Sequence, residues 1–252
     1  MRMTTSITSL DNPLVKRLRR LHEVRHRRED RAFLVEGVRA IAGFLAHGWQ
    51  PLELVLVQDQ ELPDGWDGRL VTRVAPAIAA KLSQASTPSG YLAAFRLPEA
   101  PSLDLAAGGL VLCGISDPGN LGTLIRCAAA FAIRQVVLVG GSDPFAHKVV
   151  QASAGELATI VLQRVEAEQG LVGLRGGAPC CALVVRGGSA PTLLPRRPRW
   201  LVVGSEAHGL DAAQLAECAE QVTLPMPGGA ESLNAAMAGA IACYALFAEH
   251  QR

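Results

Sequence analysis

Two histidines and a glutamate near the start of the chain have the spacing of a zinc-protease motif. His22, Glu23 and His26 read His-Glu-x-x-His, and on a helix this spacing places two imidazoles on one face, with the glutamate as general base. A protein zinc site needs a third ligand, and the motif lies among arginines that would repel a dication. We therefore expect the match to be accidental and the chain to hold no metal, with a metalloprotease as the minor alternative.

A second group of candidate residues lies in the stretch GISDPGNLGTLIRCAAAF (114–131), where polar residues follow directly after an apolar run. The glycines permit close backbone approach, and a helix that opens near Asn120 offers free N–H groups to an anion. An ordinary turn capped by Asn120 would explain that asparagine. It would not explain Arg126, the lone charge in an otherwise apolar helix, which should have a partner or a ligand.

Two further stretches repeat this arrangement nearer the C-terminus. In WLVVGSEAHGL (200–210) an apolar run leads into Gly204-Ser205-Glu206, where the carboxylate is suited to recognise a ligand or to cap the next helix. In LPMPGGAESLNAAMAGAIACYAL (224–246) a Pro- and Gly-rich loop leads into a helix that we expect to begin with Glu231-Ser232-Leu233-Asn234. Three polar side chains in one turn exceed what capping needs, and the small residues that follow permit close packing against another backbone.

The three stretches need a scaffold that brings them together, and the apolar runs supply one. Five short runs end in Gly or Pro, and Ala-rich segments of helical length separate most of them: GLVLCGI, QVVLVGG, CALVVRGG, WLVVGSE and QVTLPMP. This alternation predicts an α/β fold with a parallel sheet covered on both faces. Ligands of such sheets bind beyond the carboxyl ends of the strands, which is where the polar residues stand.

The first hundred residues are organised differently. Behind a possible cap at Asp11 or Asn12, four apolar residues recur at helical spacing and predict one amphipathic helix: Leu14, Leu18, Leu21 and Val24. The basic segment, residues 16–31, holds eight basic and three acidic side chains, which leaves 16 basic and 20 acidic ones elsewhere. This asymmetry favours a polyanion contacted locally, although a solvated helix face explains it equally well.

Length and composition exclude some classes of protein. The chain has 252 residues, of which 49% are apolar, enough for one large domain or two modest ones. Its six cysteines have no CxxC spacing and several lie in apolar runs, as expected of buried thiols in a reducing compartment. The N-terminus lacks the apolar core of a secretory signal, and the longest apolar run is shorter than a membrane span. We expect a soluble, cytoplasmic protein with no membrane partner.

The three strand-end stretches, in this order, resemble the three motifs of the SpoU (TrmH-like) class of RNA ribose 2′-O-methyltransferases, in the SPOUT superfamily. The N-terminal part, with NPLVKRLRRL, RAFLVEGVRAI and STPSGYLAAFRLPE, is similar to the substrate-binding domain of those enzymes, which has an L30e-like fold. The resemblance implies an L30e-like RNA-binding domain over 1–97, a linker over 98–109 and a SPOUT catalytic domain with a deep trefoil knot over 110–252. It also implies a homodimer formed through the C-terminal domain.

The resemblance further implies S-adenosyl-L-methionine as cofactor and assigns residues to it. In the family, backbone groups of the second and third motifs cradle the adenosine, which here implies Gly204, Leu224, Met226 and Leu233. The polar set around the transferred methyl and the target ribose becomes Asn120, Arg126, Glu206, Ser232 and Asn234. For the RNA phosphates we expect contacts from the basic segment, namely Arg19, Arg25, Arg27 and Arg28.

The family's proposed base is the first-motif arginine, which is Arg126 here. Because a guanidinium normally stays protonated, we instead expect Arg126 to contact the adjacent phosphate and to stabilise the developing alkoxide electrostatically. The proton would then go to a phosphate oxygen or to water. Two positions depart from the family pattern: Ala207 stands where relatives usually have glycine, and Gln151 where they often have a basic residue.

Several alternatives remain open at this point. Ribosomal RNA is the first expected substrate and transfer RNA the second, by analogy with the L30e-like domain. A non-catalytic RNA-binding protein of the same fold and a base methyltransferase are the other candidates. A serine hydrolase would need G-x-S-x-G, where Pro118 occupies the last glycine position, and no G-x-G-x-x-G follows the first strand of the expected sheet.

Overall fold

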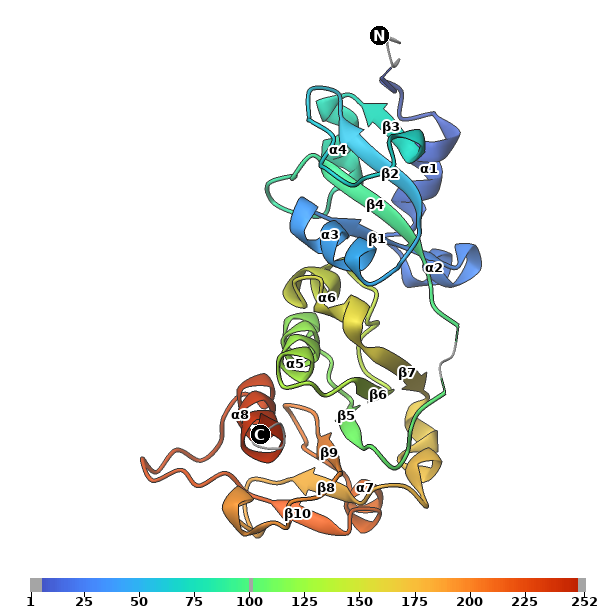
Figure 1. Cartoon of the computed structure of the whole chain (residues 1–252). Helices are drawn as coiled ribbons and strands as arrows, with labels where there is room; N and C mark the ends of the chain where they lie inside the picture. The colour runs from blue at the N-terminus through green and yellow to red at the C-terminus, as the bar shows by residue number, and fades with distance from the viewer. Residues whose placement is uncertain (1–5, 100–101, 249–252) are drawn as a thin grey trace. The chain divides into compact units, whose positions relative to one another are not determined.

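The computed structural model describes residues 6–99 and 102–248, which form two compact units with a sheet each (Figure 1). Unit 1 comprises residues 1–99 and 145–158, and unit 2 comprises residues 100–144 and 159–252. Both units combine helices with strands, so the predicted α/β class is confirmed. None of the helices in the described ranges is long and apolar enough to cross a membrane.

Unit 1 is built on a four-stranded mixed sheet of order β1-β4-β2-β3. Strand β4 pairs antiparallel with β1 and β2, and β3 pairs parallel with β2. The strands are β1 (Ala32–Glu36), β2 (Pro51–Val57), β3 (Val71–Val74) and β4 (Tyr91–Arg96). The helices of this part are α1 (Pro13–Arg20), α2 (Val24–Asp30), α3 (Val38–Ala46), the 3-10 turn η1 (Gly68–Leu70) and α4 (Pro76–Leu82).

The basic segment is two helices and not the single amphipathic helix that we predicted. Helix α1 begins as expected, because the side chain of Asn12 accepts a hydrogen bond from the backbone N–H of Leu14 at 2.9 Å. The apolar stripe ends at Leu21, since α1 stops at Arg20 and Val24 is 43% exposed at the start of α2. The break leaves free backbone carbonyls, and a side chain from α2 satisfies them, as described below.

Unit 1 is completed by a segment that lies between β6 and β7 in chain order. Residues 145–158 contain α6 (His147–Ala152), which contacts β1. The Phe145 ring packs 4.7 Å from that of Phe33, between centroids. The predicted division of the chain at 97 and 109 does not anticipate this insertion, because it depends on packing between residues more than a hundred positions apart.

A buried carboxylate holds the inserted segment. Glu36, whose side chain is 2% exposed, lies 3.1 Å from Nε2 of His147 and accepts hydrogen bonds from Ser83 Oγ at 2.8 Å and the backbone N–H of Ser89 at 3.1 Å. Burial by itself would raise the pKa of the Glu36 carboxyl. The hydrogen bonds from His147, Ser89 and Ser83 outweigh burial and hold this pKa below its ordinary value.

Unit 2 is built on a six-stranded sheet of order β10-β8-β9-β5-β6-β7, in which every pairing is parallel. The strands are β5 (Gly109–Cys113), β6 (Gln135–Val139), β7 (Val161–Val165), β8 (Cys180–Leu183), β9 (Trp200–Val203) and β10 (Glu220–Val222). The helices are α5 (Pro118–Ala130), α7 (Ala212–Ala216), α8 (Ala235–Phe247) and the 3-10 turns η2 (Glu156–Thr159, at the junction of the units), η3 (Ala167–Gln169), η4 (Val172–Leu174) and η5 (Pro191–Leu193). The five predicted apolar runs are therefore confirmed as parallel strands, and β7 is an addition.

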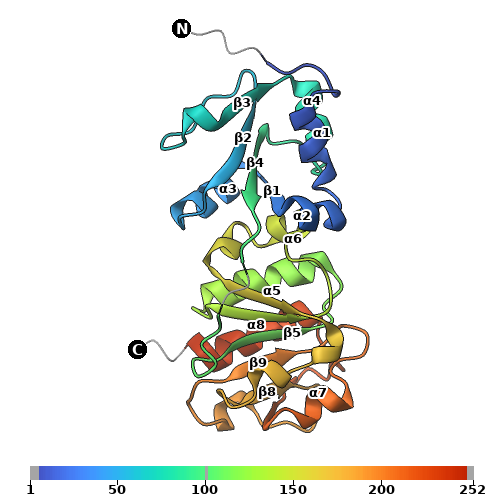
Figure 2. The ribbon, with the colours of Figure 1, turned by 90° about the vertical axis from the view of Figure 1, so that its right-hand side faces the viewer.

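Both faces of this sheet are covered, as predicted. One face packs Val111, Val137 and Val202 against Leu171 and Leu174. On the other face α5 and α8 lie side by side (Figure 2). A Cβ at Gly239 of α8 would come within 2.4 Å of a methyl carbon of Leu124, which confirms that small residues allow the close packing of α8. The trefoil knot stays a prediction.

Candidate active site

A cavity of about 390 Å³ opens beyond the carboxyl ends of β8 and β9 in unit 2. We call it the strand-end cavity. All four residues that the resemblance assigns to the cofactor line it: Gly204, Leu224, Met226 and Leu233. They come from the end of β9, the end of β10 and the loop before α8, so one cavity brings together two of the three predicted stretches.

A glycine turn forms one wall of the strand-end cavity. The backbone groups of Ser205 and Gly209 exchange hydrogen bonds of 3.2 and 3.0 Å, which closes the turn. A Cβ at Gly204 would lie 2.3 Å from the carbonyl carbon of Gly209, so this position has no room for a side chain. The backbone at Ala207 is not in the left-handed region. The substitution of glycine by alanine therefore causes no backbone strain at this departure from the family pattern.

Polar side chains from all three predicted stretches meet beside the cavity. Nδ2 of Asn120 donates to Oε1 of Glu206 at 2.7 Å, and Nδ2 of Asn234 lies 3.4 Å from Oδ1 of Asn120. Asn120 is available for this contact because Asp117 caps α5, accepting from the backbone N–H of Asn120 at 2.7 Å. The alternative in which Asn120 is only a helix cap is therefore wrong.

Helix α8 begins later than we predicted. Asn234 is its N-cap and accepts from the backbone N–H groups of Ala236 at 2.9 Å and Met237 at 3.3 Å. Glu231 and Ser232 precede the helix in an exposed loop, because an asparagine side chain alone satisfies the free N–H groups of the first turn. Ser232 lines the cavity together with Glu206 and Asn234.

Arg126 stands apart from the other members of the predicted polar set. It is exposed on α5, and its side chain makes no hydrogen bond or ion pair with any residue in the described part of the chain. Of the two alternatives that we expected for this arginine, a partner within the protein is not found among the described residues, because the helix turns this position toward solvent. The guanidinium is free to meet a ligand from outside the chain.

The four arginines predicted to contact RNA divide into three groups. Arg25 pairs with Glu29 at 2.7 Å, whereas Arg19 and Arg28 are exposed and unpaired among the described residues. Arg27 is only 5% exposed, and its Nη1 donates to the carbonyls of Leu21 at 2.8 Å and His22 at 2.9 Å. The expectation that Arg27 belongs to an exposed basic surface is not met, because its guanidinium satisfies the carbonyls at the break between α1 and α2.

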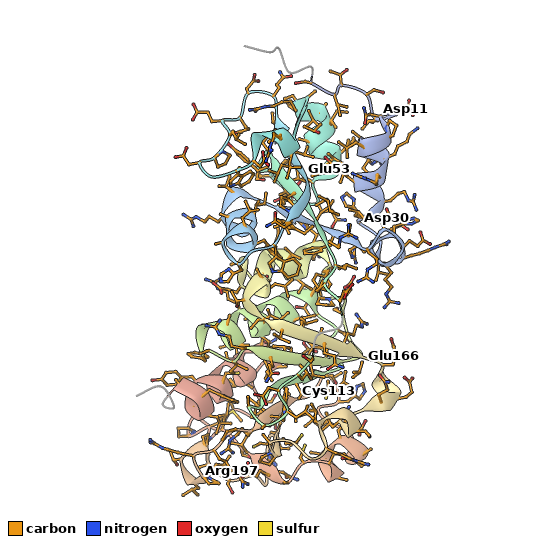
Figure 3. All side chains as sticks on the ribbon, turned by 45° about the vertical axis from the view of Figure 1, so that its right-hand side comes forward. Asp11, Asp30, Glu53, Cys113, Glu166 and Arg197 are labelled. Carbon is orange, nitrogen blue, oxygen red and sulfur yellow. The ribbon has the colours of Figure 1, made fainter. Side chains whose placement is uncertain are left out.

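Acidic side chains take up further charge in and around the basic segment, which includes the labelled Asp30 in Figure 3. Glu29 accepts from Arg25 and lies 2.8 Å from Nδ1 of His26, and these two hydrogen bonds lower the pKa of its carboxyl to about 2. Glu53 on β2 pairs with Arg17 at 2.7 Å. The basic segment therefore presents fewer free cations than its composition indicates.

The two histidines of the zinc-like motif do not share a helix. His22 lies in the break, with Nε2 at 2.9 Å from the carbonyl oxygen of Leu82, whereas His26 lies on α2 against Glu29. Burial is the main reason that the pKa of His22 is lowered. Across residues 6–99 and 102–248, no group of three or more His, Cys, Asp or Glu side chains is arranged to hold a metal ion.

Cavity residues at the end of β8 escaped the sequence reasoning. Leu183, Val184 and Val185 line the strand-end cavity, although we had recognised only the strand that contains them. Their apolar side chains gave no signal, because we searched for polar residues after each strand. The one indication in the sequence was that CALVV is the run directly before WLVVGSE, because consecutive strands are often neighbours, and β8 and β9 are neighbours in this sheet.

The cysteines of unit 2 are not placed for nucleophilic chemistry. Burial raises the pKa of the Cys113 and Cys218 thiols to about 12 and that of the Cys180 and Cys181 thiols to about 11. These thiols stay protonated near neutral pH and are therefore poor nucleophiles. They pack as small apolar groups, as the sequence indicates.

The fold and the cavity define the class of protein: it is an α/β protein with a small-molecule cavity beyond the carboxyl ends of a parallel sheet. The model of the SpoU rRNA Methylase family matches residues 109–244, and that of the MRM3-like substrate binding domain matches residues 12–93. The chain belongs to the SpoU rRNA methylase family, which confirms the resemblance stated from the three motifs.

Three relatives illustrate this membership. An uncharacterized tRNA/rRNA methyltransferase of Synechocystis is 32% identical, over 95% of this chain and 92% of its own. The 23S rRNA (guanosine(2553)-2′-O)-methyltransferase RlmP of Bacillus subtilis is 29% identical, over 95% and 98%. The crystal structure of an AdoMet-bound rRNA methyltransferase from Sinorhizobium meliloti is similar with a TM-score of 0.85 and 27% identity, over 98% and 99% of the two chains.

Proposed function

We propose that this protein transfers a methyl group from S-adenosylmethionine to a ribose 2′-OH of large-subunit ribosomal RNA. The observation that carries the proposal is the meeting of Asn120, Glu206 and Asn234 at the strand-end cavity. The Bacillus relative is named for ribose methylation of 23S rRNA, and the Sinorhizobium structure has AdoMet bound. Both relatives match this chain over nearly its whole length.

The residues of the strand-end cavity fit this cofactor. Its volume of about 390 Å³ lies in the range of small-molecule sites, and its walls are largely apolar with a few convergent polar groups. The missing side chain at Gly204 lets the turn close against the backbone of Gly209, and both glycines line the cavity. We assign the adenosine to the backbone groups of Gly204, Leu224, Met226 and Leu233, with Ser232 at the polar side of the cavity.

When bound, the cofactor supplies an electrophilic methyl group on a positively charged sulfur. The hydrogen bonds between Asn120, Glu206 and Asn234 fix the orientation of three polar side chains beside that position. Orientation of the reacting groups supplies much of the rate in such a transfer. We assign these side chains to positioning the ribose, and Glu206 also places a negative charge beside the cavity.

The ribose hydroxyl must lose its proton as its oxygen attacks the methyl carbon. We propose that Arg126 stays protonated, contacts the phosphate next to the target ribose and stabilises the developing negative charge on the 2′ oxygen. Its exposure and its lack of a partner among the described residues support this role. The proton goes to a phosphate oxygen of the RNA or to water.

Unit 1 is the proposed substrate-binding part, since residues 12–93 match the substrate-binding model. We assign phosphate contact first to Arg19 and Arg28, which are exposed and unpaired among the described residues. Arg25 contributes only where RNA displaces Glu29 from it. Arg27 acts by holding the break between the two helices in place.

We further propose a homodimer formed through unit 2. Helix α8 presents an apolar stripe at spacings of four and three residues, in which Met237 is 59%, Ile241 45% and Tyr244 63% exposed. Sedimentation should show a dimer for the native protein and a monomer for Ile241→Asp. The matched control, Val172→Asp, also places a charge on an exposed valine of unit 2 and should stay dimeric. A monomeric native protein would contradict the dimer.

We place the protein in the cytoplasm, where RNA is available and thiols stay reduced. All six cysteines are free, with no disulfide among them. Transfer RNA is the second candidate substrate, and the methyl-transfer assay described next distinguishes it from ribosomal RNA.

The test of the proposed function follows a labelled methyl group. Purified protein, labelled S-adenosylmethionine and either ribosomal or transfer RNA should give label in the ribosomal RNA, in a dinucleotide that resists alkali. A 2′-O-methyl group blocks alkaline cleavage of the next phosphodiester, whereas a base methyl does not. Glu206→Gln keeps the size of the side chain and should lower the transfer. Cofactor binding without transfer to any RNA would favour a non-catalytic binding protein.

A further inference from the structure

The strand-end cavity has an electrostatic mismatch with its proposed cofactor. Among the described residues that line it, Glu206 is the one with an ionisable side chain, and no Lys, Arg or His is present. S-adenosylmethionine carries two positive groups, the sulfonium and the ammonium, and one carboxylate. Glu206 is a partner for a positive group, while the carboxylate finds no cation in the cavity wall.

A short loop beside the cavity carries the arginine that is nearest to its wall along the chain. Arg186 directly follows Val185, the last wall residue from β8. It is exposed and makes no hydrogen bond or ion pair with any residue in 6–99 or 102–248. Two other arginines of unit 2, Arg197 and Arg199, both pair with Glu220 at 2.7 Å and are therefore occupied.

The loop is held at both ends against β10. On one side of Arg186, the backbone N–H of Val184 donates to the carbonyl of Val222 at 2.9 Å. On the other side, the N–H of Gly188 donates to Oγ1 of Thr223 at 2.9 Å, and Ser189 continues the pairing with backbone bonds of 2.9 and 3.0 Å. Only residues 185–187 lie between these anchors, so the backbone of Arg186 is held next to the cavity wall.

Glycines determine the path of this loop. Gly187 has a φ of +86°, which a side-chain-bearing residue adopts only with strain. A Cβ at Gly188 would lie 2.7 Å from the carbonyl carbon of Val222, so the loop passes directly over β10. Leu224, two residues after Val222, lines the cavity. The loop and the cavity wall are therefore anchored on the same strand.

We propose that Arg186 binds the carboxylate of the cofactor's amino-acid part at the mouth of the strand-end cavity. A guanidinium matches a carboxylate with two parallel N–H···O bonds, so the arginine selects this end of the ligand by shape and by charge. The assignment rests on the proposed function, since it presupposes S-adenosylmethionine. It makes Arg186 a residue of cofactor specificity, separate from the polar set at the ribose.

The test compares two ligands that differ only in the carboxylate. S-adenosylhomocysteine has it, and its decarboxylated analogue S-adenosyl-3-thiopropylamine lacks it while keeping the amine. Titration calorimetry should show that Arg186→Gln weakens binding of the first roughly tenfold and of the second less than twofold, because one charged contact is lost. Arg186→Lys should recover part of the loss, since it keeps the charge without the fork.

Arg134→Gln is the matched control, because the Arg134 side chain is also exposed and unpaired among the described residues. Arg134 directly precedes β6, at the amino end of a strand that lies three positions from β8 in the sheet order. This variant should leave both affinities unchanged. Equal weakening of both ligands by Arg186→Gln would show a structural effect and overturn the proposal, and so would no weakening of either. An unchanged cofactor affinity with a raised KM for RNA would assign Arg186 to an RNA phosphate instead. Failure of the native protein to bind either ligand would contradict the proposed function itself.

Discussion

The strand-end cavity and the basic segment meet their proposed ligands with opposite kinds of surface. The cavity is largely apolar, and its shape is set by strand ends and by a glycine turn that excludes a side chain at Gly204. The basic segment consists of two helices on which arginine occurs in three environments: ion-paired, buried, and exposed without a partner among the described residues. In a site whose walls are formed by backbone, the fold determines which positions face the ligand. On a surface built from long side chains, the role of each charge depends on which acceptors lie within its reach.

The largest effect that we expect concerns a residue that belongs to neither region. Arg126→Ala should lower the rate of methyl transfer by about 10²–10³, the usual cost of removing one donor from a developing oxyanion. The affinity for S-adenosylhomocysteine should stay unchanged, because Arg126 does not line the strand-end cavity. Single-turnover transfer and calorimetry measure the two quantities. Arg126→Lys with full turnover would exclude specific guanidinium recognition, and Arg134→Lys is the neutral control.

A change to the backbone-built site comes next in size. Gly204→Ala should weaken S-adenosylhomocysteine binding about 100-fold, because the added Cβ would lie 2.3 Å from the carbonyl carbon of Gly209 and the turn would have to move. Gly173→Ala is the control, since its Cβ would meet no atom within 4 Å. Native-like affinity in Gly204→Ala would mean that the turn can move without loss of cofactor binding. The contrast between a rigid cavity and an adaptable basic segment would then be wrong.

Two neighbouring arginines on α2 test the different roles that we assign within the basic segment. Arg27→Ala should lower the free energy of unfolding by about 2–3 kcal/mol, because two carbonyls lose a charged donor in a buried place. Arg28→Ala should leave stability unchanged and reduce the salt dependence of RNA binding by about one phosphate contact. Denaturant unfolding and filter binding at several salt concentrations distinguish the two. If Arg28→Ala were the more destabilising change, the assignment of roles would be reversed.

The smallest expected effect depends on pH and concerns Glu36. Because its pKa is lower in the folded protein, the unfolded chain binds the proton first as pH falls. The stabilisation from Glu36 is therefore complete above the unfolded value of about 4.3 and is lost as pH decreases through the folded value. Glu36→Gln should cost about 1–2 kcal/mol at pH 7 and should flatten the acid limb of the stability profile. An unchanged acid limb in the variant would show that other carboxylates control it.

Five of the six strands of unit 2, and the polar residues that follow three of them, were found from local patterns, whereas three other features were not. β7 was missed because Gln163 and Arg164 interrupt its apolar run at the edge of the sheet. The break between α1 and α2 depends on a buried side chain six residues away, which no periodicity records. The late start of α8 follows from the cap at Asn234, and several polar residues competed for that role. Local patterns predict where strands end, but they do not predict which of several similar side chains a tertiary contact selects.

The inserted segment has a consequence for the folding of the protein during its synthesis on the ribosome. Chains emerge from their N-terminus, and domains generally fold in that order. Unit 1 depends on Phe145 and His147, and the indole N–H of Trp49 donates to the carbonyl of Ala158 at 3.1 Å. Its core is therefore incomplete until residue 158 has been synthesised, by which time β5, α5 and β6 of the other unit already exist. The proposed RNA-binding unit comes first in the sequence, yet its fold is completed only after a large part of the proposed catalytic unit has been synthesised.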